Sequence, residues 1–175
     1  MDDSHSDALV FFGATGDLAY KKIVPSLQAM VKHGTLDAPV IGVAKSGWNL
    51  DQFRARAYDS LEKHGGADRV AFDKLCGLLR YVDGDYKDPA TFRAIRNELG
   101  SRRQPAHYLA IPPVLFGLVV EQLGKSGCAN GARVIVEKPF GTDLVSARAL
   151  NAILLGAFEE KAIIRTWVRM LLVPQ

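Results

Sequence analysis

The sequence predicts an α/β domain built on a doubly wound, mostly parallel sheet. Short apolar runs alternate with longer amphipathic stretches over short connections, the pattern of a parallel sheet with helices on both faces. A glycine-bearing turn also joins the first apolar run directly to a helix. The 175 residues suffice for one domain with a sizeable core. We expect residues 8–165 to form that domain, after a flexible tail at residues 1–7.

The expected elements follow in order along the chain. Continuous apolar runs predict buried strands at 8–13, 39–44, 106–111 and 133–138, and a shorter strand-like piece begins at residue 79. Amphipathic periodicity predicts helices at 18–33, 51–63, 69–79, 89–99, 114–125 and 143–161. Asp88 is suited to cap the fourth helix, and Pro89 fits its first turn because the missing N–H is not needed there.

Composition and charge exclude several classes of protein. Hydrophobic residues make up 48% and charged residues 23% of the chain, an ordinary globular balance. A net charge of +3 is too small to indicate nucleic acid or a membrane surface as a partner. No apolar run approaches the ~20 residues that span a bilayer. The acidic, polar start MDDSHSDA does not resemble a secretory signal, so a cytoplasmic protein is expected. The two cysteines lack metal-binding spacing, and no metal site is predicted.

The turn Gly13-Ala14-Thr15-Gly16 is the first candidate for a binding site. Glycines at a strand end let a pyrophosphate approach the backbone, and the N-terminus of the following helix supplies unpaired N–H groups. The pattern is neither a full GxGxxG fingerprint nor a P-loop. The alternative is a purely structural turn in which Asp17 is an ordinary helix cap.

The end of the second predicted strand bears on the choice of nucleotide. NAD-preferring folds place an Asp or Glu about 20 residues after the glycines, where it accepts hydrogen bonds from the ribose hydroxyls. This sequence has Lys45 and Ser46 at that strand end. A cation and a hydroxyl favour the 2′-phosphate of NADP, although a solvated lysine at a strand end is also common.

Four segments together resemble the glucose-6-phosphate dehydrogenase family. They are GATGDLAYKKIVPSL, GVAKSGW, HYLAIPP and VIVEKPFGTDLVSARALN, and the last is the most specific. The resemblance covers roughly residues 8–165 and implies a Rossmann-like fold that binds NADP. It also implies oxidation of glucose 6-phosphate to a lactone, with a sugar phosphate as substrate and a homo-oligomer for the full-length enzyme.

The resemblance further implies roles for individual residues. The cofactor would contact the turn and four strand ends, through Gly13, Ala14, Thr15, Gly16, Asp17, Leu18, Lys45, Asp85, Tyr86, Tyr108 and Lys138. Lys138 would also contact the sugar phosphate, and Lys22 is a weaker candidate for the same substrate. Lys45 stands where the family usually has an arginine, so the bidentate fork that an arginine offers is missing.

The family's catalytic histidine is not found in this sequence. In the family a histidine oriented by a carboxylate lies in and just after a segment that reads RIDHYLGK, whereas here FEEKAIIR is followed by TWVRMLLVPQ. We therefore expect a divergent tail at residues 166–175, and a chain truncated before the catalytic segment and the family's second α+β domain, with a shifted reading frame as one explanation. Such a chain is expected to bind NADP without efficient turnover. The alternative is a non-catalytic NADP-binding regulatory or sensor module.

Overall fold

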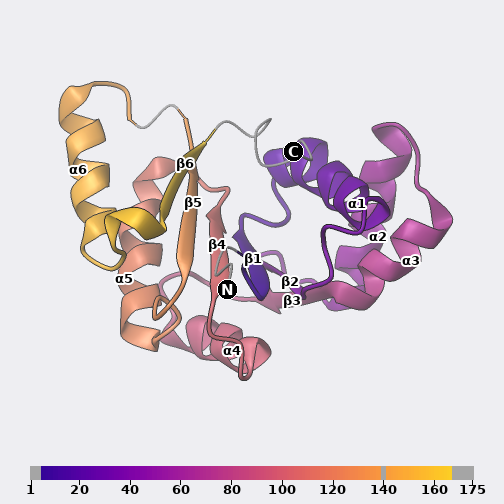
Figure 1. Cartoon of the computed structure of the whole chain (residues 1–175), viewed down its shortest axis with the longest axis horizontal. Helices are drawn as coiled ribbons and strands as arrows, with labels where there is room; N and C mark the ends of the chain where they lie inside the picture. The colour runs from indigo at the N-terminus through magenta and orange to yellow at the C-terminus, as the bar shows by residue number, and fades with distance from the viewer. Residues whose placement is uncertain (1–4, 139–140, 167–175) are drawn as a thin grey trace.

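The computed structural model describes residues 5–138 and 141–166, which form one six-stranded sheet between two layers of helices (Figure 1). The strand order is β3-β2-β1-β4-β5-β6, and each neighbouring pair is parallel. The strands are β1 (Ala8–Phe12), β2 (Val40–Ala44), β3 (Leu79–Asp83), β4 (Pro105–Leu109), β5 (Arg133–Glu137) and β6 (Ile163–Thr166). The doubly wound parallel sheet predicted from the sequence is confirmed.

The helices cover the two faces of the sheet in chain order. Figure 1 shows the first three helices on one side and the last three on the other. They are α1 (Val24–Lys32), α2 (Leu50–Lys63), α3 (Arg69–Leu78), α4 (Pro89–Leu99), α5 (Phe116–Ser126) and α6 (Leu144–Leu155). A π-helical turn, η1 (Ala19–Ile23), leads directly into α1, and 3₁₀ turns lie at Pro113–Leu115 and Glu160–Ala162.

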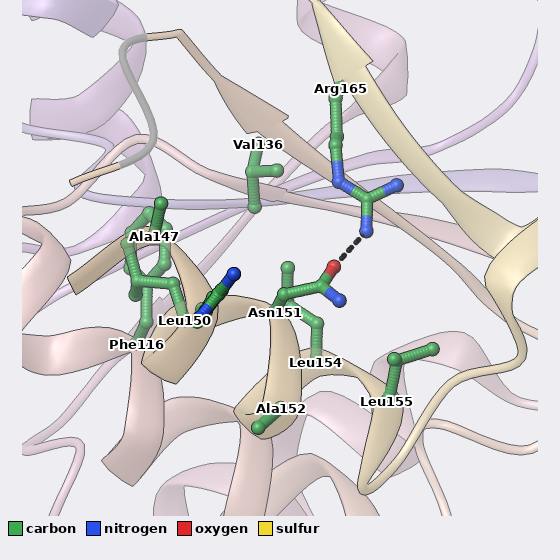
Figure 2. Close-up of a pocket in the computed structure, with 10 residues that line it drawn as sticks. Phe116, Val136, Ala147, Leu150, Asn151, Ala152, Leu154, Leu155 and Arg165 are labelled. Atoms are coloured by element: carbon green, nitrogen blue, oxygen red, sulfur yellow. Dashed lines mark hydrogen bonds between the residues drawn. The ribbon is translucent and has the colours of Figure 1, made fainter. Parts of the chain in front are cut away.

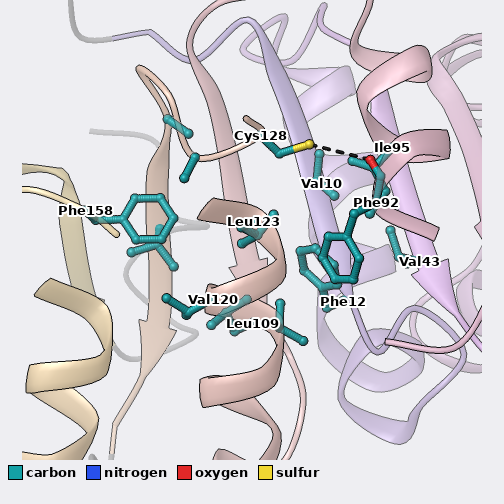
Figure 3. Close-up of a cluster of buried hydrophobic side chains, with 14 of the residues drawn as sticks. Val10, Phe12, Val43, Phe92, Ile95, Leu109, Val120, Leu123, Cys128 and Phe158 are labelled. Carbon is teal, nitrogen blue, oxygen red and sulfur yellow. Dashed lines mark hydrogen bonds between the residues drawn. The ribbon is translucent and has the colours of Figure 1, made fainter. Parts of the chain in front are cut away.

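Each face of the sheet carries its own hydrophobic core, because successive residues of a strand point to opposite faces. Phe12 packs in the core beneath α4 and α5, where it stacks on Phe92 with ring centroids 6.0 Å apart (Figure 3). Its neighbour Phe11 packs in the other core against Phe53 of α2, at 6.0 Å. Both phenylalanines are fully buried. Burial on both faces explains why these strands read as continuous apolar runs.

Local sequence signals account for several helix starts. The side chain of Asp88 accepts a hydrogen bond from the N–H of Ala90, and Pro89 occupies the first turn of α4 as predicted. Asn49 and Gln52 form a capping box at the start of α2. Asp143 and Ser146 form the corresponding box at α6. Each box satisfies backbone N–H groups that have no acceptor inside the helix.

The length predicted for the last helix was wrong. The sequence predicts one helix over 143–161, but α6 ends at Leu155 with Gly156 as its C-cap. A 3₁₀ turn follows, and then β6 pairs in parallel with β5, so that Ile163 lies opposite Val134. The sequence did not predict β6. Of the tail predicted at residues 166–175, positions 167–175 lie outside the described residues.

Candidate functional site

The strand order changes direction at the junction of β1 and β4, and the glycine turn lies at this junction. In open parallel sheets a crevice forms at such a point, at the carboxyl ends of the strands. Gly13 follows β1 with φ +83°, and a Cβ atom there would come within 2.1 Å of the carbonyl oxygen of Ala110, which follows β4. Only glycine therefore fits where the two strand ends meet.

Backbone hydrogen bonds define the shape of the turn. The N–H of Gly13 donates to the hydroxyl of Tyr86 at 2.8 Å, and the N–H of Gly16 donates to the carbonyl of Gly13 at 3.0 Å. The N–H of Tyr20 donates to the carbonyl of Gly16 at 3.1 Å, which is a helical hydrogen bond. The N–H groups of residues 17–19 precede it and have no acceptor within the helix, so this helix start can receive an anion.

Polar side chains from the segments that follow β1 and β2 meet beside this turn. The hydroxyl oxygens of Thr15 and Ser46 lie 2.7 Å apart. Lys45, at the end of β2, donates from Nζ to the carboxylate of Asp85 at 2.8 Å. The two side chains are 71% and 39% exposed, so water screens their attraction. The hydrogen bond from Lys45 lowers the pKa of the Asp85 carboxyl.

Asp83 holds the loop that carries Lys45 and Ser46. One of its carboxylate oxygens accepts hydrogen bonds from the N–H groups of Ser46 and Gly47, each at 2.9 Å, and from the hydroxyl of Tyr81 at 2.8 Å. Partial burial raises the pKa of Asp83, but these hydrogen bonds outweigh that effect and the net pKa lies below the ordinary value. The carboxylate is therefore charged at neutral pH and fixes the backbone after β2.

A second group of polar side chains lies at the ends of β4 and β5. The hydroxyl of Tyr108 donates to the carboxylate of Glu137. Burial raises the pKa of Glu137, and the positive charge of Lys22 opposes that rise. Lys138 follows β5 directly and its side chain is exposed. The fold thus places Lys22, from the π-helical turn η1, close enough to act electrostatically on the end of β5.

Several residues that the sequence predicted to contact the cofactor are buried or already bonded to other groups of the protein. The hydroxyl of Tyr86 is taken up by the backbone, since it accepts from Gly13 and donates to the carbonyl of Val43 at 3.3 Å. The ring of Tyr108 is buried in the core beneath α1. Ala14 is buried as well, and the exposed carboxylate of Asp17 pairs with Lys21 at 3.5 Å.

Sequence reasoning missed two carboxylates of this region. Glu137 stands inside the EKP segment next to Lys138, and its position at a predicted strand end was a usable signal. Asp83 is the last residue of β3, and its hydrogen bonds to the loop after β2 depend on the pairing of β3 with β2. That pairing between distant segments has no local signal in the sequence.

None of the four histidines lies at the carboxyl edge of the sheet. His33 and His64 are the C-caps of α1 and α2, and His5 precedes β1. His107 is fully buried in β4. Within residues 5–138 and 141–166 no group of three or more His, Cys, Asp or Glu side chains is arranged to hold a metal ion. The helices of that same part of the chain are too short or too polar to cross a membrane.

A separate pocket of about 430 Å³ lies between α6 and the strands β5 and β6 (Figure 2). Its walls are mostly apolar, and Arg165 donates a hydrogen bond to the side chain of Asn151 at its rim. No residue predicted to bind cofactor or substrate lines this pocket. It is therefore distinct from the region around the glycine turn.

The fold and the turn define a doubly wound domain of the dinucleotide-binding class. Residues 10–166 match the family described as "Glucose-6-phosphate dehydrogenase, NAD binding domain". The chain belongs to the glucose-6-phosphate dehydrogenase family, a family of oxidoreductases.

Similar proteins agree with this assignment. The chain is 41% identical over 160 residues to glucose-6-phosphate 1-dehydrogenase 1 of Mycobacterium tuberculosis, a match that covers 91% of this chain and 34% of the relative. The crystal structure of the Mycobacterium avium glucose-6-phosphate 1-dehydrogenase matches with a TM-score of 0.87 at 42% identity, over 92% of this chain and 36% of the other. A glucose-6-phosphate dehydrogenase in complex with glucose 6-phosphate matches with a TM-score of 0.79 at 30% identity, over 91% and 36%. The chain thus spans about a third of the relatives it matches.

Proposed function

We propose that this chain is the NADP-binding domain of a glucose-6-phosphate dehydrogenase. The observation that carries the proposal is the contact of Thr15 with Ser46 beside the glycine turn, where the two hydroxyl oxygens lie 2.7 Å apart and Lys45 directly precedes Ser46 in the chain. In an NAD-binding fold an acidic residue at the end of β2 would accept hydrogen bonds from the ribose hydroxyls. Here the residues at that position are donors, which suits a phosphate on the ribose.

The donor groups of the site fit the two anionic parts of NADP. The N–H groups of residues 17–19, which have no acceptor within the helix, suit a pyrophosphate at the helix start. Lys45 with the hydroxyls of Thr15 and Ser46 suits the 2′-phosphate. To reach it, Lys45 would exchange Asp85 for the phosphate, and this exchange costs little because water screens the attraction between the two exposed side chains. Once bound, the cofactor supplies the nicotinamide ring that accepts hydride.

The second polar group would serve the sugar phosphate. We propose that Lys138 and Lys22 contact a substrate of the glucose 6-phosphate type, because ammonium groups neutralise phosphate and donate hydrogen bonds to sugar oxygens. Tyr108 would fix the carboxylate of Glu137 and thereby the end of β5. The ring of Tyr108 is buried, so any effect of this tyrosine on cofactor binding would pass through Glu137.

The 175 residues alone are expected to bind cofactor without efficient turnover. Removal of the hydroxyl proton needs a base beside the substrate, and general-base catalysis typically contributes about 10²–10⁴-fold to the rate. The four histidines of the chain lie at helix ends, before β1 and inside β4. Oxidation of the sugar phosphate is therefore proposed for the whole enzyme that contains this domain.

Calorimetric titration with NADP and with NAD tests the proposal. The chain should bind NADP more tightly than NAD. Lys45→Ala should weaken NADP binding by about 10- to 100-fold, because a hydrogen bond to a charged group contributes about 1.5–3 kcal/mol. NAD binding by this variant should stay unchanged.

Lys125→Ala is the matched control, since Lys125 is an exposed lysine of α5 that pairs with Glu121 away from the turn. Equal affinity of the unaltered chain for NADP and NAD would overturn the preference for NADP. A folded chain that bound neither nucleotide would overturn the proposed function altogether.

A further inference from the structure

Arg56 of α2 lies beside the glycine turn although no sequence motif assigned it a role. Its guanidinium carbon sits 4.0 Å from the centre of the Tyr20 ring, and one terminal nitrogen donates to the carbonyl oxygen of Thr15 at 3.5 Å. Thr15 is also the residue whose hydroxyl meets Ser46. Three segments of the chain therefore bring a guanidinium and two hydroxyls to the same corner of the turn, and Lys45 directly precedes Ser46 there.

The donors of Arg56 are poorly used within the described part of the chain. A guanidinium carries five N–H donors. The contact with Thr15 is at the long limit of a hydrogen bond, and the buried Nε atom has no partner among the described residues. Buried polar groups in proteins are nearly always paired, so such a group calls for an explanation. An anionic ligand beside Thr15 would give this arginine a strong acceptor.

The surroundings of Arg56 hold it in place. The hydroxyl of Tyr20 donates to the carboxylate of Asp59, and Asp59 pairs with Lys63 at 3.4 Å. The hydrogen bond to Asp59 holds the ring of Tyr20 in place, and the guanidinium of Arg56 lies over the face of this ring. Because Asp59 already has two partners, it competes less strongly for the charge of Arg56.

We propose that Arg56 is a specificity-determining residue that contacts the 2′-phosphate of NADP. This inference rests on the proposed function, because it concerns the same cofactor. Lysine at position 45 offers a point charge without a bidentate fork, and Arg56 supplies the planar guanidinium from α2 instead. The 2′-phosphate would then lie between Lys45, Arg56 and the hydroxyls of Thr15 and Ser46.

Paired titrations of the full 175-residue chain test the inference, with NADP against NAD and with 2′,5′-ADP against 5′-ADP. Arg56→Gln keeps much of the side-chain length and removes the charge. This substitution should weaken the binding of NADP and 2′,5′-ADP by about tenfold or more, as expected for the loss of a charge-assisted hydrogen bond. The binding of NAD and 5′-ADP should stay unchanged. The affinity of Arg56→Lys for NADP and 2′,5′-ADP should lie between those of the unaltered chain and Arg56→Gln. Arg54→Gln is the matched control, since Arg54 of the same helix instead donates to the carbonyl of Cys76 at 2.9 Å.

The outcomes separate this inference from the function on which it rests. A fall for Arg56→Gln that is confined to the ligands with a 2′-phosphate supports the inference, provided thermal unfolding shows the variant folded. An equal fall in affinity for all four ligands, or no fall for any of them, overturns the role of Arg56. If the unaltered chain still prefers NADP to NAD, the proposed function stands in that case. No preference in the unaltered chain overturns both.

Discussion

At the residue scale, burial determines the protonation of His107. Its Nε2 atom lies 2.8 Å from the carbonyl oxygen of Cys128, and a carbonyl only accepts, so Nε2 carries the proton. Its Nδ1 atom is buried and has no partner among the residues that the structure describes. Burial lowers the pKa of His107 to about 4. The imidazole is therefore neutral and structural at physiological pH.

This depressed pKa predicts how stability depends on pH. Between about pH 6.5 and pH 4 the unfolded histidine binds a proton that the folded one does not. The free energy of unfolding should therefore fall as the pH is lowered through this range, by about 3 kcal/mol in total. Urea unfolding of the chain and of His107→Gln at several pH values measures the effect. Identical slopes for both proteins would show that His107 does not titrate in this way.

At the element scale, the junction of β1 with the first helix depends on one glycine. Gly13→Ala would force a side chain into a left-handed conformation and into the carbonyl of Ala110. We expect a loss of at least about 1–3 kcal/mol in stability from the backbone strain alone.

Gly77→Ala provides the contrast, because Gly77 lies in α3 and a Cβ there would meet nothing within 4 Å. This substitution should stabilise the chain by about 0.5–1 kcal/mol. Thermal unfolding of both variants measures the two effects. A stable Gly13→Ala protein would mean that β1 and β4 do not approach so closely.

The elements that the sequence predicted share a strong local signal. β1, β2, β4 and β5 are buried apolar runs, and the capping residues Asn49, Asp88 and Asp143 stand directly before their helices. The end of α6 had only Gly156 as a signal, since the residues that follow it are rich in Ala, Glu and Lys and suit a helix. The four residues of β6 are too few to show a period of their own.

The candidate site divides in the same way. Gly13, Thr15, Lys45 and Lys138 were predicted because glycine turns and strand ends can be read from consecutive residues. Asp83 and Arg56 could not be predicted, since each reaches its place through packing between segments that are far apart in sequence. Tyr86 and Tyr108 carry hydroxyls at the carboxyl edge of the sheet, as predicted from the sequence, but only the structure reveals which groups those hydroxyls contact.

At the scale of the whole molecule, the sheet ties the two hydrophobic cores together. β1 and β4 are paired on both sides, whereas β3 and β6 each have one paired side in the described sheet. Exchange of amide hydrogens from interior strands requires opening of both cores, and exchange from an edge strand requires less. We expect the slowest exchange in β1 and β4 and faster exchange in β6. Mass spectrometry of peptides from each strand measures this order, and protection of β6 equal to that of β1 would contradict it.

The burial of Cys128 gives the chain a reporter of its own. Cys128 is 1% exposed, and its sulfur lies 3.7 Å from the carbonyl oxygen of Phe92 (Figure 3). Burial raises the pKa of the Cys128 thiol. Cys76 is half-buried in α3, so an alkylating reagent should modify it first. In a Cys76→Ser protein, alkylation of Cys128 would then report how often the packing between α4 and the end of α5 opens.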